Sequence, residues 1–269
     1  MHRNVLHLAV AAGLLGLAAC KESTSPTAAL YNDSTVTADV AASSGDAMAT
    51  TVSTMLTNEA AATLTAPPSA FSLFAPLRST VSWSGSRTCY DSTGAVVSAC
   101  SPMSSVREIV TAFTLNGSRA DTTTVTGGGT RIFSGAVHRA GTDTLTRNFT
   151  SGTETSRTHS SLVTSHDTTT FSNSATNVAR THDESAADSV RGLTWNLPHS
   201  SNPFPVSGYI VRVDTVHSTF TSPTTTASKT VVKVVKITFP ADAQGNVTLT
   251  IDNKTCNLNL VTRVVSICH

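Results

Sequence analysis

The order of hydrophobic and polar residues changes along the chain from a helical period to the period of strands. Before residue 66, apolar residues fall at helical spacing, at Met48, Val52, Met55, Leu56 and Ala60. This spacing predicts a helix over residues 44–65 whose apolar stripe packs against a sheet. Ser44 or Asp46 is expected to cap the start of this helix, and Pro67 and Pro68 are expected to end it.

From Thr80 to the C-terminus, the pattern is typical of strands separated by turns. The strongly apolar segments lie near the C-terminus, at Tyr209–Val213, Thr230–Phe239, Val247–Ile251 and Leu258–Ile267. In one of them, Val247, Leu249 and Ile251 alternate with threonines, as expected for a strand with one buried face. The strands before residue 209 are weakly apolar, so we expect many of them to carry polar side chains on both faces at several positions. This fits a sheet whose outer part is solvated, or the rim of an open barrel.

A weak internal repeat runs through these polar strands. Asp143–His159 and Asp167–His182 agree at Asp-Thr-x-Thr and at Arg-Thr-His. Related starts occur at Asp121, Asp188 and Asp214, with spacings of 21 to 26 residues. Two strands of about 8 to 9 residues with two turns have this length. Each unit is therefore predicted to be one hairpin that begins with a capping Asp.

Together these patterns predict a mainly β fold. We expect a large antiparallel meander of hairpins, as an open or curved sheet or a half-barrel, with one N-terminal helix packed on it. The chain of 269 residues has room for a single β-rich domain over residues 43–269. Residues 20–42 are expected to form a flexible tether that contains at most a short strand at 34–40.

Four cysteines in this domain are expected to form two local disulfides. Residues 88–100 read TCYDSTGAVVSAC and residues 255–268 read TCNLNLVTRVVSIC, so both hold Thr-Cys, a short spacer and Val-Val-Ser-x-Cys. A hairpin with a turn at 91–94 or near 261–263 brings its ends within disulfide distance, which one straight strand cannot do. We therefore predict the disulfides Cys89–Cys100 and Cys256–Cys268, and no metal site made of cysteines.

The first 20 residues carry a segment typical of export. Arg3 precedes an apolar stretch, Val5–Leu17, that is too short to span a bilayer, and LAAC follows at residues 17–20. This segment resembles the signal peptide and lipobox of bacterial lipoproteins. The resemblance implies cleavage after residue 19, lipid modification of Cys20 and attachment to a membrane through acyl chains. Because Lys21 and not Asp follows Cys20, the resemblance to this class also implies sorting to the outer membrane, facing the periplasm or the cell surface.

The charge balance excludes one class of partner. The formal net charge is +1, and only 13% of the residues are charged, against about 25% in typical domains. Removal of Arg3 with the signal peptide leaves no net charge, so nucleic acid is not an expected partner. Serine and threonine take the place of charged residues, which suits solvated strands.

The sequence holds no motif of a known catalytic class, because GxSxG, SxxK, HExxH, GxxxxGK and GxGxxG are all absent. Histidines are the remaining candidates, at His138, His159, His166, His182, His199 and His217. Hairpins stacked in register would bring His159 and His182 together, with neighbouring carboxylates as further ligands for a divalent metal. The alternative, which we favour, is that both are surface residues carried by the repeat.

These observations favour a non-catalytic structural or interaction lipoprotein of the cell envelope. It would need no cofactor, and its partners would be the membrane, reached through Cys20, and other envelope proteins. The alternative is a carrier, in which a curved sheet closed on one side by the helix holds an apolar ligand such as a lipid. Such a protein would be similar in architecture to half-barrel envelope carriers and would need a lined pocket of roughly 300–1,000 Å³. A hydrolase of envelope polymers is a third hypothesis, without support from a motif.

Overall fold

A computed structural model of the chain describes residues 33–63, 79–98, 100, 105–125, 129–173, 177–266 and 268–269. These residues form the helix α2, Asp33–Thr63, and ten strands. The strands are β1 Ser79–Tyr90, β2 Val96–Val97, β3 Glu108–Val125, β4 Gly129–Thr150, β5 Thr153–Asn173, β6 Val178–Asn196, β7 Ser207–Thr221, β8 Thr226–Thr238, β9 Asn246–Ile251 and β10 Lys254–Asn259.

The ten strands form one antiparallel sheet in the order β10-β9-β8-β7-β6-β5-β4-β3-β1-β2. From β3 to β10, each strand pairs with its neighbour in the chain, so this part is a plain meander. At the other end of the sheet the order differs from that of the chain: β1 pairs directly with β3, and the short β2 pairs with the outer side of β1. The predicted class, a mainly β meander of antiparallel strands with one N-terminal helix, is confirmed.

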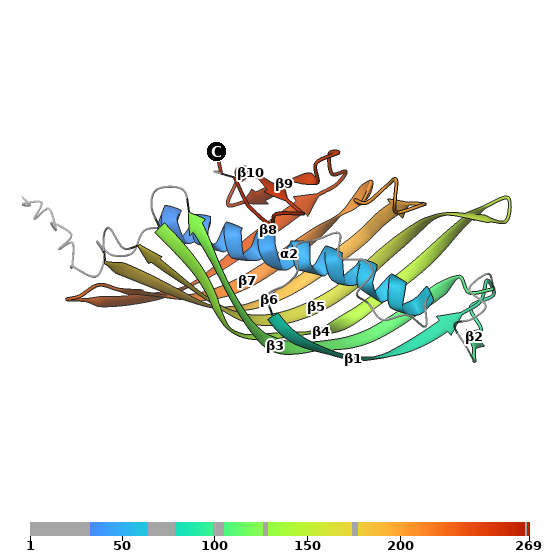
Figure 1. The fold of residues 1–269 in the computed structure, drawn as a ribbon, viewed down its shortest axis with the longest axis horizontal. Helices are drawn as coiled ribbons and strands as arrows, with labels where there is room; N and C mark the ends of the chain where they lie inside the picture. The colour runs from blue at the N-terminus through green and yellow to red at the C-terminus, as the bar shows by residue number, and fades with distance from the viewer. Residues whose placement is uncertain are drawn as a thin grey trace, which may run out of the picture.

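The sheet is curved and holds the helix on its concave side (Figure 1). α2 runs along the trough, and the C-terminal strands β9 and β10 rise along one flank of the helix. Between Val36 and Leu56 most side chains of α2 are buried, on all sides of the helix rather than along one stripe. A helix covered in this way belongs to the interior of the fold, whatever the polarity of its residues.

The start of the helix differs from the sequence prediction. α2 begins at Asp33, so residues 33–42 are helical, and neither a tether nor a strand at 34–40. Ser44 and Asp46, predicted as caps, lie in the middle of the helix and are buried. The β-branched residues near Val36 and Val40 favour a strand locally, but burial of both valines against the sheet overrides that preference. Pro67 and Pro68 lie outside the described residues.

The length of the repeat has a different structural meaning from the one predicted. β4, β5 and β6 contain 22, 21 and 19 residues, so one unit of the repeat is one long strand with one turn, not a hairpin. Asp143, Asp188 and Asp214 therefore lie within strands, where they are buried, and cap no turn. Neighbouring strands that share a register over their whole length need similar lengths, which accounts for the nearly constant spacing.

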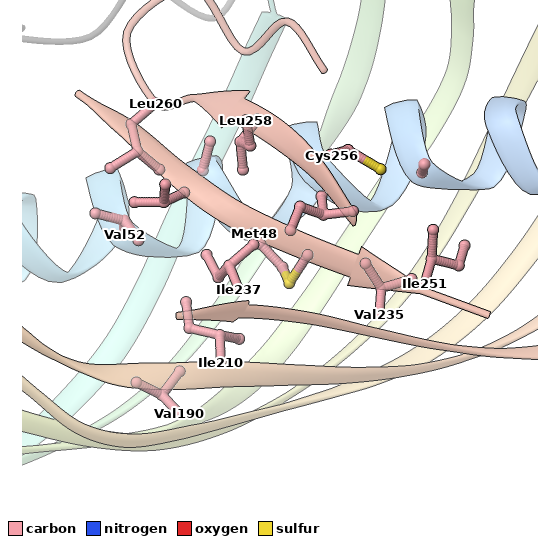
Figure 2. Packing of buried hydrophobic residues seen from close by; sticks show 14 of the residues in the cluster. Met48, Val52, Val190, Ile210, Val235, Ile237, Ile251, Cys256, Leu258 and Leu260 are labelled. Carbon is pink, nitrogen blue, oxygen red and sulfur yellow. The ribbon is translucent and has the colours of Figure 1, made fainter. Parts of the chain in front are cut away.

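The apolar core lies at the C-terminal end of the sheet. Figure 2 shows side chains from α2 and from β6 to β10 gathered in one cluster around Met48. Val247, Leu249 and Ile251 are buried in this cluster, as their alternation predicted. At Gly45 a Cβ atom would lie 2.6 Å from Val265 Cγ2, so the absence of a side chain lets the helix approach the C-terminal segment.

Both predicted disulfides are present, Cys89–Cys100 and Cys256–Cys268. In the first loop Asp91 Oδ1 accepts hydrogen bonds from the backbone N–H groups of Thr93 and Ala95, and Gly94 has φ of 82°. In the second, Asn259 Oδ1 accepts from the N–H groups of Val261 and Thr262. Asn259 is the turn-forming residue that the prediction near 261–263 lacked.

Candidate functional site: charged residues between the helix and the sheet

The inner face of β4 to β7 is polar, yet α2 buries it. Charged and hydroxyl side chains of these strands meet polar side chains of the helix in three clusters, which we call the Asp39, Arg212 and Glu59 clusters. Polar side chains on both faces were expected here, but the sequence prediction did not include burial of the inner, polar face by the helix. Buried ions must be paired and hydrogen-bonded, so the partners of each cluster decide its character.

The Asp39 cluster lies near the start of α2. Arg180 Nε and Nη2 donate to the Asp39 carboxylate at 2.6 and 3.1 Å, which is a two-point contact. His182 Nε2 lies 3.0 Å from Asp39 Oδ2, and His182 Nδ1 lies 2.8 Å from Ser218 Oγ. The imidazole of His182 is thus held at both nitrogens and is fully buried.

The Arg212 cluster lies at the middle of the helix. Arg212, on β7, is fully buried and donates to Asp188 at 3.1 Å and to Asp214 at 3.2 Å. The helix contributes hydroxyl groups, because Ser44 donates to Asp214 and Thr51 donates to Asp188, both at 3.3 Å. One guanidinium therefore joins two strands of the sheet to α2.

Arg212 faces more carboxyl groups than it can neutralise, and one of them, Asp167, also pairs with Arg139 at 3.4 Å. Asp167 and Glu184 lie 3.8 and 4.0 Å from Arg212 Nη2. Burial, followed by the charge of Asp214, raises the pKa of Glu184 well above its usual range. Burial alone would lower the pKa of Arg212, but the surrounding carboxylates outweigh it and raise that pKa. Burial and the neighbouring carboxylates thus favour the protonated form of Glu184, although it lies beside a permanent cation.

The Glu59 cluster lies near the end of the helix. Glu59 accepts from three side chains of the sheet and the following loop: His159 Nε2 at 2.6 Å, Arg157 Nη1 at 2.7 Å and His199 Nε2 at 2.8 Å. The other nitrogen of His159 donates to Asp143, 2.9 Å away on β4. A single carboxylate on α2 therefore collects three donors that lie far apart in the sequence.

These contacts fix the charge state of His159. Burial alone would lower the pKa of His159, but the carboxylates of Asp143 and Glu59 outweigh it and raise that pKa to about 10. Burial would raise the pKa of Glu59, but its histidine and arginine partners outweigh it and hold that pKa far below the usual range. An imidazolium has no free lone pair, so His159 is neither a metal ligand nor a general base at neutral pH.

The structure does not bring His159 and His182 together. His159 lies opposite Leu193, whereas His182 lies opposite Thr169, ten residues further along β5. Ten residues of a strand span about 33 Å. The favoured alternative is also wrong, because both histidines are fully buried rather than on the surface. Within the described ranges, no three His, Cys, Asp or Glu side chains are arranged to hold a metal ion.

The other candidate histidines have different surroundings. His199 belongs to the Glu59 cluster. His138, His166 and His217 are exposed on the outer face of the sheet, on β4, β5 and β7. This face carries mostly hydroxyl and small side chains, and it is hollowed over β1, β3, β4 and β5. The hollow has a volume of about 640 Å³, and the lining includes Leu162 and Thr164.

The sequence prediction missed the residues on which these clusters depend, namely Asp39, Glu59 and Arg212. One signal for the last was present. In β7, Arg212 and Asp214 stand in phase with Ile210 and Val216, and all four are buried. Charged residues that share the period of core residues indicate a buried ion pair when the two charges are opposite. For Asp39 and Glu59 no such signal exists, because their partners lie about 100 residues or more away.

Comparisons with known proteins identify no family. No protein-family model matches the chain, and neither a curated protein nor a solved structure matches it. No helix in the described part of the chain is long and apolar enough to cross a membrane.

Proposed function

We propose that the chain is a non-catalytic interaction protein of the bacterial cell envelope, held at a membrane by lipidated Cys20. Cys20 lies outside the described residues, and the lipobox is its support. The observation that carries the interaction role is the way α2 fills the trough. Its apolar side packs into the core and its polar side is engaged in three buried clusters, so the outer face of the sheet is left for partners.

The outer face has properties that suit a partner of low charge. Its strands present hydroxyl groups around several exposed apolar side chains. Val213 and Val234 are direct neighbours on β7 and β8, and Val232 on β8 is 62% exposed. Leu162, beside the hollow on β5, is 56% exposed. Apolar groups grouped on one face of a sheet are a common feature of protein interaction surfaces.

The alternative function, a carrier for an apolar ligand, receives less support from the inner side of the sheet. Between α2 and β3 to β5, a gap beside Met55, Phe113 and Val163 has a volume of about 10 Å³. That is room for about one water molecule, whereas an acyl chain needs a pocket of several hundred Å³. A carrier would have to release α2 from its ion pairs before a lipid could enter the trough.

The anchor can be tested by metabolic labelling with a fatty acid. We expect the unaltered chain to incorporate label and to fractionate with membranes, and Cys20→Ser to do neither. Cys89→Ser is the matched control, because it removes a cysteine that we assign to a disulfide rather than to lipid. Equal labelling of the unaltered chain and Cys20→Ser would disprove the anchor.

The interaction role can be tested with a photoreactive residue at position 162 or 234 in the membrane-bound protein. We expect a defined crosslinked species from these positions and much less from position 226, at an exposed end of β8. Native mass spectrometry of the gently extracted protein separates the alternatives. A bound lipid that organic solvent releases, with no specific crosslink, would replace the interaction role by the carrier.

A further inference from the structure

Two exposed histidines lie side by side on the outer face of the sheet. His138 on β4 is the direct cross-strand partner of His166 on β5. Side chains at such paired positions point to the same face, with Cβ atoms about 4.5–5.5 Å apart. His138 alternates with buried Arg139, and His166 alternates with buried Ser165, so both imidazoles point to solvent. This is the arrangement that His159 and His182 lack.

The hydrogen bonds of His138 leave a ring nitrogen suited to a metal ion. His138 Nδ1 lies 2.5 Å from Asn116 Oδ1, the neighbouring residue on β3. An amide oxygen only accepts hydrogen bonds, so Nδ1 carries the proton and Nε2 carries the lone pair. A partner that fixes the tautomer of a histidine in this way is a usual feature of metal sites.

The contacts of His166 turn its ring toward β6. His166 Nε2 lies 3.2 Å from Asp183 Oδ1, on β6, and His166 Nδ1 lies 3.1 Å from Ser185 Oγ. To share a metal ion with His138, the His166 ring must rotate toward β4 and give up both of these exposed contacts. His166 and Asp183 are 55% and 52% exposed, so both side chains have room to rotate.

We propose that His138 and His166 form a surface site for a divalent transition metal ion such as Zn²⁺ or Cu²⁺. The two imidazoles supply the nitrogen ligands, the charge of Asp183 attracts the cation, and water completes the coordination. Imidazole nitrogens are the preferred ligands of these ions, and Cu²⁺ binds such sites more tightly than Zn²⁺. The site needs only side-chain rotation at exposed positions. It does not depend on the proposed envelope function.

The proposal is tested by isothermal titration of the full chain, produced without a histidine tag, with Zn²⁺ and Cu²⁺. We expect one site that binds Cu²⁺ more tightly than Zn²⁺. His138→Ala and His166→Ala should each lower the affinity at least about tenfold, and Asn116→Ala should lower it about tenfold through the tautomer of His138. Affinity should fall in acid, because protons compete with the metal ion for the imidazole nitrogens.

His217→Ala is the matched control. His217 is exposed on the same face, two strands from His166, and its Nδ1 bonds to the Thr230 hydroxyl. We expect His217→Ala to bind both ions like the unaltered chain, and the melting temperatures of all variants to agree without metal. Unchanged affinity in His138→Ala and His166→Ala would overturn the proposal. So would loss of binding in His217→Ala alone.

Discussion

Both sides of α2 are buried, but by opposite chemistry. Toward β7 to β10, the helix contributes Met48 and Val52 to a cluster of valine, leucine and isoleucine side chains. Toward β4 to β7, it contributes Asp39, Thr51 and Glu59, and meets arginine, histidine and carboxylate side chains. The difference shows that polar side chains on a strand need not be exposed to solvent. A helix that packs on the strand can bury them when it supplies hydrogen-bonding and ion-pairing partners.

The two sides also contribute differently to the fold. Burial of apolar surface is favourable without directional partners, so the apolar side supplies stability. Buried ion pairs gain little relative to apolar packing, because desolvation offsets their attraction. The buried ion pairs instead fix the position of α2 along the sheet. Asp39 and Glu59 are 20 residues apart, or about 30 Å of helix, and each has specific partners. A slide of α2 by one turn would separate both carboxylates from those partners.

The largest effect is expected from Arg212→Met, which removes the cation of the Arg212 cluster. It leaves Asp188 and Asp214 buried without their partner, and loss of one member of a buried pair costs about 3–5 kcal/mol. Urea unfolding with intact disulfides would measure this loss. Arg191→Met is the matched control, because Arg191 is exposed on β6 and should change stability by less than about 0.5 kcal/mol. Equal values for the two variants would show that the buried charges are not coupled.

The apolar side is tested by Leu249→Ala, for which we expect a loss of about 3 kcal/mol. Leu249 is fully buried beside α2, so the variant loses transfer free energy and leaves a cavity. Val234→Ala, on the exposed outer face, is the control and should cost well under 1 kcal/mol. Unlike the polar variants, Leu249→Ala should show the same loss at every pH. A loss that varied with pH would mean that the two sides are not independent.

A smaller effect with a distinct pH profile is expected from Glu59→Gln, about 2 kcal/mol near pH 5.5. Glu59 has a lowered pKa, so its stabilisation is present above about 4.5, its ordinary value, and is lost as pH falls below it. The pKa of His159 is raised to about 10, so its stabilisation is complete below about 6.5 and is lost as pH rises toward 10.

The difference between wild type and Glu59→Gln should therefore be largest between about pH 4.5 and 6.5 and decline on both sides. Unfolding free energies at pH 3, 5.5 and 9 are sufficient to check this shape. Asp183→Asn, which changes an exposed carboxylate on β6, is the control and should give a nearly flat difference. A flat difference for Glu59→Gln would mean that His159 is not held as an imidazolium by Glu59.

The same contrast separates what the sequence could predict from what it could not. The C-terminal strands follow from alternation at Val247, Leu249 and Ile251, because one buried face produces a period of two. The disulfides follow because each joins cysteines 11 or 12 residues apart, so local turn chemistry decides the pairing. Both signals lie within a short segment of chain.

The polar side could not be predicted because its signals are not local. Glu59 and His159 are 100 residues apart, and only the packed helix brings them within 2.6 Å. The start of α2 was missed for the same reason, since burial stabilises the helix near Val36 against local strand preference. The metal hypothesis for His159 and His182 failed because the repeat was interpreted as a hairpin, which halves the true strand length.

The smallest effect is expected from Glu184→Gln, which should stabilise the protein near pH 7. The pKa of Glu184 is raised by burial and by Asp214, so the folded state favours the protonated carboxyl. The stabilisation that Glu184 contributes to the folded state is complete below its ordinary pKa of about 4.5. It is lost as pH rises toward the higher pKa of Glu184 in the folded state. A glutamine of the same shape has no proton to lose. We expect a rise in melting temperature of about 2–4 °C at pH 7 and none at pH 4. A fall at pH 7 would mean that Glu184 is ionised and serves Arg212 as a counter-ion.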